Sequence, residues 1–296
     1  MFSVVIPLYN KEDCIEKTLH SVLNQSYLNF EVIIVDDGST DQSVEIVSSI
    51  NDQRIRLITQ PNGGPSAARN TGIQNSSGDF IAFIDADDIW DLDYLLEMDQ
   101  LIKDFPNGVL YGFNYTIIEN GNTLEKVTKD FRGYIDERWK SFPFFFCTSA
   151  SCCRTIALKT IGGFDERMIY GEDMDVWFRL LLKGKGVLDS RIMAYYYKDA
   201  DDTLTKHNMP LEKHLPYYLD KYKEARSDNH DFRRFFDEQM IYRLYPYLFD
   251  KKYKKEVRRL SKQLDYSQLK ASMRFRMKHP RIYCTIKKVK AFLAKA

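Results

Sequence analysis

Short apolar runs and amphipathic stretches follow one another along residues 2–84. The apolar runs have strand length and predict buried strands at residues 2–7, 30–35, 55–59 and 80–84. The stretches between them carry apolar residues at helical spacing and predict helices at residues 11–25, 42–50 and 66–74. This alternation predicts an α/β fold with a parallel sheet that helices cover on both faces.

The pattern is looser after Trp90. It predicts helices at residues 92–105, 157–161 and 172–183, extended chain at 109–118 and 191–197, and mostly loop at 121–140. Beyond residue 210 nearly everything is predicted helical, with breaks near residues 228–231, Pro246 and Pro280. We therefore expect an α/β domain at residues 1–208 and a helical extension at 209–296.

Polar clusters follow the strands where a parallel sheet binds ligands, at the carboxyl ends. Asp85-Ala86-Asp87-Asp88 comes directly after the fourth predicted strand. Clustered carboxylates repel one another unless a cation compensates, and Mg²⁺ or Mn²⁺ prefers oxygen ligands shared with substrate phosphates. This position favours a metal site, although Asp-x-Asp elsewhere is more often structural.

Three further clusters carry candidate chemistry. Asp37 follows the second strand, and its carboxylate could accept hydrogen bonds from a base or a ribose. The structural alternative for this cluster is an Asx-turn that leads into a helix cap. Tyr9, at the end of the first strand, offers a ring on which a base could stack. Gly63 and Gly64 precede a helix that carries Arg69, which favours an anion. Glu172-Asp173 begins a later helix, where acids complement the helix dipole but also suit a general base.

Together these motifs resemble the family-two glycosyltransferases, which are inverting enzymes with a GT-A fold, over roughly residues 2–207. The resemblance rests on six motifs in order: residues 4–10 with Glu12, 36–41, 63–72, 85–88, 162–165 and 172–173. It implies a nucleotide-diphosphate sugar donor, a Mn²⁺ or Mg²⁺ cofactor and a role in bacterial cell-surface polysaccharide synthesis.

The resemblance also implies residue roles. Asp173 would be the base, with Glu172 beside it as a second candidate catalytic residue, and Asp87 would bind the metal, with His207 as a further candidate ligand. The donor, most often a uridine diphosphate sugar, would be bound by a set of residues from the first four motifs: Pro7, Tyr9, Glu12, Asp37, Gly64, Arg69, Asp85 and Ala86.

Charge is unevenly distributed, although the formal net charge is only +1. Residues 251–296 contain sixteen Lys and Arg against two acids, whereas the preceding 250 residues contain 27 basic and 40 acidic groups. The basic region suits an interfacial helix on an anionic membrane, and equally a helix packed on the acidic body. In the first case a lipid-linked saccharide would be a fitting acceptor; no nucleic-acid motif accompanies the cations.

Composition limits the remaining possibilities. The five cysteines form no C-x-x-C pair, no signal peptide opens the chain, and no apolar run is long enough to span a bilayer. These features predict a cytoplasmic protein, peripheral at the inner face of the plasma membrane if the basic helices bind lipid. The Gly-x-Gly-x-x-Gly of dinucleotide oxidoreductases, the Gly-rich basic loop of nucleotidyltransferases and the Gln-x-x-Arg-Trp of polymer synthases are absent. An inactive sugar-nucleotide-binding or scaffold protein stays the alternative.

Overall fold

The computed structural model describes residues 1–119, 121–124, 130–135, 146–197, 210–267 and 271–279. The chain divides into two compact units, of which the first comprises Met1–Asp136 and Phe142–Asn208 and the second Glu137–Ser141 and Met209–Ala296.

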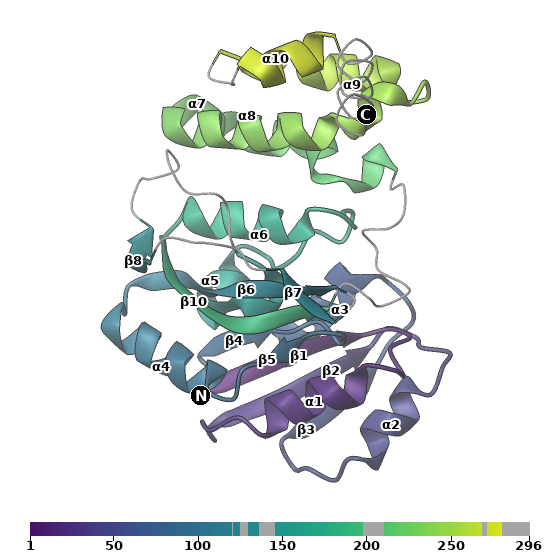
Figure 1. The fold of residues 1–296 in the computed structure, drawn as a ribbon, viewed down its shortest axis with the longest axis vertical. Coiled ribbons are helices and arrows are strands. Elements are labelled where there is room, and N and C mark those ends of the chain that lie inside the picture. Colours follow the sequence, from purple (N-terminus) through teal and green to yellow (C-terminus); the bar gives the residue numbers. More distant parts are fainter. Residues whose placement is uncertain (120, 125–129, 136–145, 198–209, 268–270, 280–296) are drawn as a thin grey trace, which may run out of the picture. The chain divides into compact units, whose positions relative to one another are not determined.

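A ten-stranded mixed sheet forms the centre of the first unit, counted over the described residues (Figure 1). Eight strands follow the order β3-β2-β1-β4-β9-β6-β10-β5, while β7 pairs with β6 and β8 with β10. The strands are β1 (Phe2–Leu8), β2 (Phe30–Asp36), β3 (Ile55–Thr59), β4 (Phe80–Phe83), β5 (Ile89–Trp90), β6 (Gly108–Glu119), β7 (Asn122–Leu124), β8 (Arg132–Ile135), β9 (Ser151–Arg154) and β10 (Lys185–Tyr197).

The first four long strands pair in parallel, as the strand and helix alternation predicted. β6 and β10 also pair in parallel, whereas β9 joins β4 to β6 with antiparallel pairing on both sides. The prediction of mostly loop at residues 121–140 was wrong where β7 and β8 form, and β10 begins at Lys185 rather than at 191. β8 and β10 depend on partners distant in the sequence, which local periodicity does not report, whereas β7 pairs with the nearby end of β6.

Helices cover both faces of this sheet (Figure 1). On one face, Val4 and Ile6 of β1 pack with apolar residues of α1 (Ile15–Leu23), α2 (Ser43–Ser49) and α4 (Tyr94–Asp104). On the other face, Val5 packs with residues of α3 (Pro65–Asn75), α5 (Thr155–Thr160) and α6 (Glu172–Leu181). The one-residue alternation along β1 therefore supplies both layers, as expected for a strand with two buried faces.

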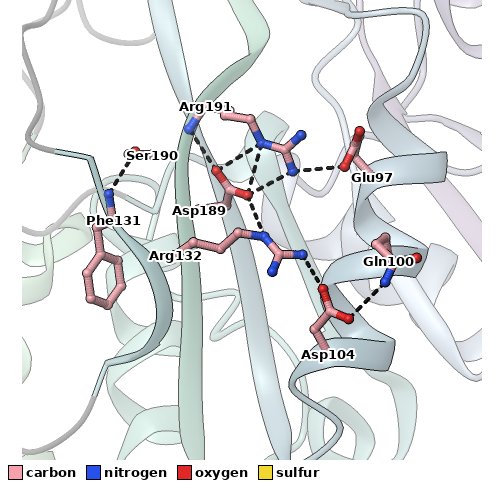
Figure 2. Close-up of polar contacts among 8 residues, drawn as sticks. All are labelled: Glu97, Gln100, Asp104, Phe131, Arg132, Asp189, Ser190 and Arg191. Atoms are coloured by element: carbon pink, nitrogen blue, oxygen red, sulfur yellow. Dashed lines mark hydrogen bonds and ion pairs between the residues drawn. The ribbon is translucent and has the colours of Figure 1, made fainter.

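A buried carboxylate connects three elements of the first unit (Figure 2). Asp189 of β10 is 2% exposed and accepts hydrogen bonds from Arg132 of β8 and from Arg191. These two arginines also pair with Asp104 and Glu97 of α4. The cluster lies beside the register shift between Asp189 and Ile192, so it anchors β10 where regular pairing is interrupted.

The second unit is helical over its described residues. It contains η3 (Leu211–Lys213), η4 (Leu215–Tyr222), α7 (Lys223–Asp228), α8 (His230–Leu244), η5 (Pro246–Phe249), α9 (Lys254–Ser261) and α10 (Ala271–Lys278). The predicted breaks near residues 228–231 and at Pro246 are confirmed, whereas Pro280 lies outside the described residues. Arg226 and Asp237 form a buried ion pair, with Nε and Oδ1 2.7 Å apart. None of the helices in the described part of the chain is long and apolar enough to cross a bilayer.

Candidate active site

The acidic loop 85–88 follows β4 and is held in place by its third acid. Asp88 is fully buried; its Oδ2 accepts a hydrogen bond from the Ser149 hydroxyl, and its Oδ1 accepts one from the Tyr197 amide at 3.2 Å. Ser149 Oγ also accepts a hydrogen bond of 3.0 Å from the Asp85 amide. Burial raises the pKa of Asp88 well above its usual value, and the charges of Asp87 and Asp85 raise it further. Asp88 therefore positions the loop.

Asp87, the predicted metal ligand, faces a lysine. The ammonium of Lys11 lies 2.8 Å from Asp87 Oδ2, and both side chains are largely buried. Burial raises the pKa of Asp87; the Lys11 charge opposes this rise and the Asp85 charge adds to it. A nearby cation therefore stabilises the charged form of the Asp87 carboxylate.

The residues around Asp87 could hold Mg²⁺ or Mn²⁺ only together with phosphate oxygens of a substrate. No group of three or more His, Cys, Asp or Glu side chains suited to a metal occurs among the residues that the structure describes. Such a cation is commonly held by one or two carboxylates together with substrate phosphates, which Asp87 and Asp85 satisfy. His207 lies outside the described residues. Ala86 is 3% exposed, and its carbonyl accepts a hydrogen bond from Thr18 Oγ1 at 2.9 Å.

Arg69 of α3 connects the acidic loop to α6. Its Nη2 donates to Asp85 Oδ1 at 2.7 Å and its Nη1 donates to Glu172 Oε1 at 3.1 Å. Arg69 is 4% exposed, and its guanidinium lies over the Phe164 ring, 5.3 Å from the centroid. Burial disfavours its charged form, but the charges of Asp85 and Glu172 outweigh burial and raise its pKa. One guanidinium thus joins two motifs that are far apart in the sequence.

The acid pair Glu172-Asp173 begins α6, after Gly171 with a φ of 79°. Burial, together with the charge of Asp173, raises the pKa of Glu172 from 4.5 to about 7, against the opposing charge of Arg69. Asp173 Oδ1 accepts a hydrogen bond of 2.6 Å from the Met174 amide. Glu172 thus has a pKa near neutrality beside a fixed guanidinium and next to a second carboxylate, an arrangement suited to proton transfer.

Asp37 organises the loop that leads into α3. Its Oδ1 accepts hydrogen bonds from Gln60 Nε2 at 2.7 Å and from the Gly63 amide at 2.9 Å. Its Oδ2 accepts one from the Gly64 amide at 2.7 Å, where Gly64 has a φ of 88° that favours glycine. Asp37 is 3% exposed, so much of its acceptor capacity is used within the protein.

The first motif is tied to the second through backbone amides. Glu12 Oε2 accepts a hydrogen bond of 2.8 Å from the Gln42 amide, and Asn10 Oδ1 accepts one of 2.8 Å from the Thr40 amide. Pro7 is part of β1, whereas Tyr9 just beyond it is 44% exposed and presents its ring to solvent. Tyr9 is therefore available for stacking, while Glu12 acts on the start of α2.

Direct contacts thus join Lys11 to Asp87 and Arg69 to both Asp85 and Glu172. Sequence reasoning gave Lys11 no role in the site, and it placed Ser149 only within a segment, residues 142–149, expected to shape the specificity of the pocket. Lys11 stands between residues 4–10 and Glu12 of the first motif, and a hydroxyl inside the apolar stretch 142–153 was the available signal for Ser149.

A sequence model of the family described as "Glycosyl transferase family 2" matches residues 3–161, more than half of the chain. The chain belongs to glycosyl transferase family 2. The expected resemblance is thereby confirmed.

The chain is also similar to individual glycosyltransferases over part of its length. It is 40% identical over 120 residues to "Glycosyltransferase GlyA" of Streptococcus pneumoniae, covering 40% of this chain and 17% of that protein. It is 31% identical over 187 residues to an Escherichia coli protein, "UDP-Glc:alpha-D-GlcNAc-diphosphoundecaprenol beta-1,3-glucosyltransferase WfgD", covering 61% of this chain and 70% of that one. Five of the relatives that this chain matches, GlyA among them, are matched over only 17–36% of their own lengths.

Among solved structures, this family 2 chain is similar to TarS of S. aureus in complex with UDP-GlcNAc. The TM-score is 0.63 at 20% identity, covering 88% of this chain and 70% of that one. This likeness supports the predicted α/β fold of the GT-A type with a helical C-terminal region.

Proposed function

We propose that this chain is an inverting glycosyltransferase that transfers a sugar from a uridine diphosphate sugar to an acceptor hydroxyl in cell-surface polysaccharide or glycolipid synthesis. The observation that carries the proposal is the bridge from Asp85 through Arg69 to Glu172. Through these two ion pairs, Arg69 connects the proposed donor-binding loop to the acid pair at the start of α6. The name of WfgD contains UDP-Glc, and one TarS structure is a complex with UDP-GlcNAc; both support the choice of a uridine nucleotide.

The proposed reaction is a single displacement. Asp173 accepts the proton of the acceptor hydroxyl while that oxygen attacks the anomeric carbon from the face opposite the diphosphate, so the configuration inverts. Arg69 fixes Asp85 toward the donor and Glu172 beside the base. Positioned general-base catalysis contributes about 10²–10⁴-fold to a rate.

The donor would be held by Tyr9 at its base, by Asp37, Gly64 and Pro7 around the nucleoside, and by Asp85 and Ala86 at the ribose or sugar. Glu12 would act by positioning the first loop. Asp87, together with the diphosphate of the donor, would hold Mg²⁺ or Mn²⁺, which would neutralise charge on the leaving group. His207 stays a proposed additional ligand.

The proposed acceptor is a saccharide or a lipid-linked saccharide. The diphosphoundecaprenol in the name of WfgD supports the lipid-linked choice. The basic C-terminal region supports contact with an anionic membrane surface, which would make the protein peripheral at the inner face of the plasma membrane.

The test compares the chain with Asp173→Asn. Release of uridine diphosphate from a panel of UDP-sugars with saccharide acceptors is expected to fall by about 10²–10⁴-fold in the variant. The calorimetric affinity for uridine diphosphate with Mn²⁺ is expected to stay within about twofold, because the base does not bind the nucleotide. Asp79→Asn, whose side chain is 78% exposed and paired with the amino terminus, is the matched control.

Equal losses of turnover and nucleotide affinity would remove Asp173 from the role of base. Nucleotide binding without turnover of any donor by the native chain would instead favour the inactive binding or scaffold protein.

A further inference from the structure

The C-terminal unit contains a large cavity of its own. Described residues of η5, α9, α10 and the segments beside them line it, and its volume is about 1240 Å³. Pockets for small ligands usually measure roughly 300–1,000 Å³, so this cavity has room for a sizeable group.

Cations dominate the lining of this cavity. Five lining residues are basic and exposed: Lys251, Lys254, Arg258, Lys262 and Arg274. The lining contains one carboxylate, Asp250, and its Oδ1 already accepts a hydrogen bond of 2.8 Å from the Lys252 amide. The cavity therefore presents a strong excess of positive charge.

The five cations lack protein counter-ions within the described part of the chain. The hydrogen bonds and ion pairs found there involve none of their side-chain nitrogens, whereas Arg226 of the same unit is paired with Asp237 and Arg259 with Glu256. Like charges gathered without counter-ions repel one another, and an anionic ligand relieves that repulsion.

Apolar side chains accompany the cations. Val257 and Met277 line the cavity with Phe249, whose side chain is 46% exposed although it is large and aromatic. Lys254 and Arg258 are four residues apart on α9 and thus lie on one side of the helix, beside Val257. A free inorganic anion would use the cations alone, while a molecule with both a phosphate and a hydrocarbon part would use the whole lining.

We propose that this cavity binds the phosphate head group of an anionic lipid, with the adjoining apolar side chains contacting its hydrocarbon. The assignment rests on the lining of the cavity and does not require sugar transfer. In a chain that uses a lipid-linked acceptor, it would hold the protein at the surface where that acceptor is found.

The test measures binding of the full chain to vesicles by co-sedimentation. Three vesicle compositions are compared: phosphatidylcholine alone, phosphatidylcholine with phosphatidylglycerol, and phosphatidylcholine with a polyprenyl diphosphate. Lys254→Glu with Arg258→Glu is expected to weaken binding to the anionic vesicles at least about 20-fold, because each basic residue near an anionic surface contributes about fivefold. Phe249→Ala is expected to weaken it less, by about fivefold.

The matched control is Lys213→Glu with Lys223→Glu, which changes the net charge equally at two exposed residues of the same unit outside the cavity lining. It is expected to weaken binding by less than about threefold. Asp173→Asn is expected to bind vesicles like the native chain, so loss of catalysis and loss of lipid binding are distinguishable. Circular dichroism melting verifies that each variant is folded.

Binding to both anionic compositions would support a general phospholipid site, and binding to the polyprenyl diphosphate alone would support a site for the acceptor lipid. Equal weakening by the two double variants would overturn the proposal in favour of bulk charge. Binding to neutral vesicles as strong as to anionic ones would also overturn it, as would binding of inorganic pyrophosphate without any vesicle binding.

Discussion

Glu172 is the residue whose protonation connects stability with pH. Its pKa is raised from 4.5 to about 7, first by burial and then by Asp173. An acid with a raised pKa in the folded state binds its proton more tightly there than in the unfolded state. The native chain therefore loses stability as pH rises from about 4.5 to about 7, and the loss stays constant above that range.

Glu172→Gln is expected to remove this pH dependence. Between pH 5 and pH 8 the free energy of unfolding of the variant should rise relative to the native chain by roughly 2–3 kcal/mol. Urea unfolding at a series of pH values measures the difference. Glu45→Gln, an exposed position on α2, is the control and should show no comparable slope. A flat difference for Glu172→Gln would contradict the environment described for it.

Lys11 sets how strongly Asp87 attracts a divalent cation. The ammonium lies 2.8 Å from Asp87 Oδ2, where it occupies space and repels positive charge. Lys11→Met is expected to tighten Mn²⁺ binding without nucleotide at least about fivefold, since two unit charges 4 Å apart interact by about 1 kcal/mol even in water. Electron paramagnetic resonance of free Mn²⁺ measures this binding directly. Weaker binding in the variant would show that Lys11 supports the metal instead.

At the scale of elements, Asp189 keeps β10 attached to β8 and α4 (Figure 2). Asp189→Ala would leave the guanidinium groups of Arg132 and Arg191 without their shared partner. We expect a loss of about 2–4 kcal/mol in the free energy of unfolding, measured with urea, and little change in nucleotide affinity. Asp104→Asn, at an acid whose side chain is 35% exposed, is the control and should cost clearly less, because exposed ion pairs contribute little to stability.

The elements differ in how far the sequence alone could predict them. β1 to β4 were predicted within a few residues because each is a compact apolar run in a regular alternation. β5 has only two residues and β9 reads Ser-Cys-Cys-Arg, so both depend on their neighbours in the sheet. The helix predicted from residue 11 begins at Ile15, because residues 11–14 form a turn in which the Lys11 amide donates to Ser43 Oγ.

The candidate site was predictable in its motifs and unpredictable in its contacts. Periodicity and strand ends located Asp85, Asp87 and Arg69 at one edge of the sheet. No sequence pattern states that Arg69 bonds both Asp85 and Glu172, since that depends on how α3 and α6 pack on one face. The use of Glu12 and Asp37 to hold backbone amides is likewise a consequence of loop geometry.

At the scale of the whole molecule, donor binding should be visible as thermal stabilisation. Uridine diphosphate with Mn²⁺ at one hundred times its Kd adds about 2.7 kcal/mol to the native state. That corresponds to roughly 5–10 °C in the melting temperature of a unit of about 200 residues. Differential scanning fluorimetry with a nucleotide panel, repeated with excess chelator, measures both the base preference and the need for metal.

A shift with another nucleotide would change the donor and leave the proposed mechanism intact. If no nucleotide raises the melting temperature of protein shown to be folded, the proposal of a sugar-nucleotide transferase would be contradicted. A shift that persists in chelator would contradict the metal requirement alone.

The position of β10 in the sheet has a consequence for how the chain is made. β10 separates β6 from β5 and is the strand with which β8 pairs, yet it begins at Lys185, well beyond the family match that ends at residue 161. At a ribosomal rate of about 5–20 residues per second, β10 is synthesised several seconds after β6, and during that time the edge of β6 that pairs with β10 is unpaired. A fragment ending at residue 161 would keep that edge open permanently, which invites aggregation. Expression of a stably folded fragment therefore requires residues through Tyr197, beyond the end of the recognisable family sequence.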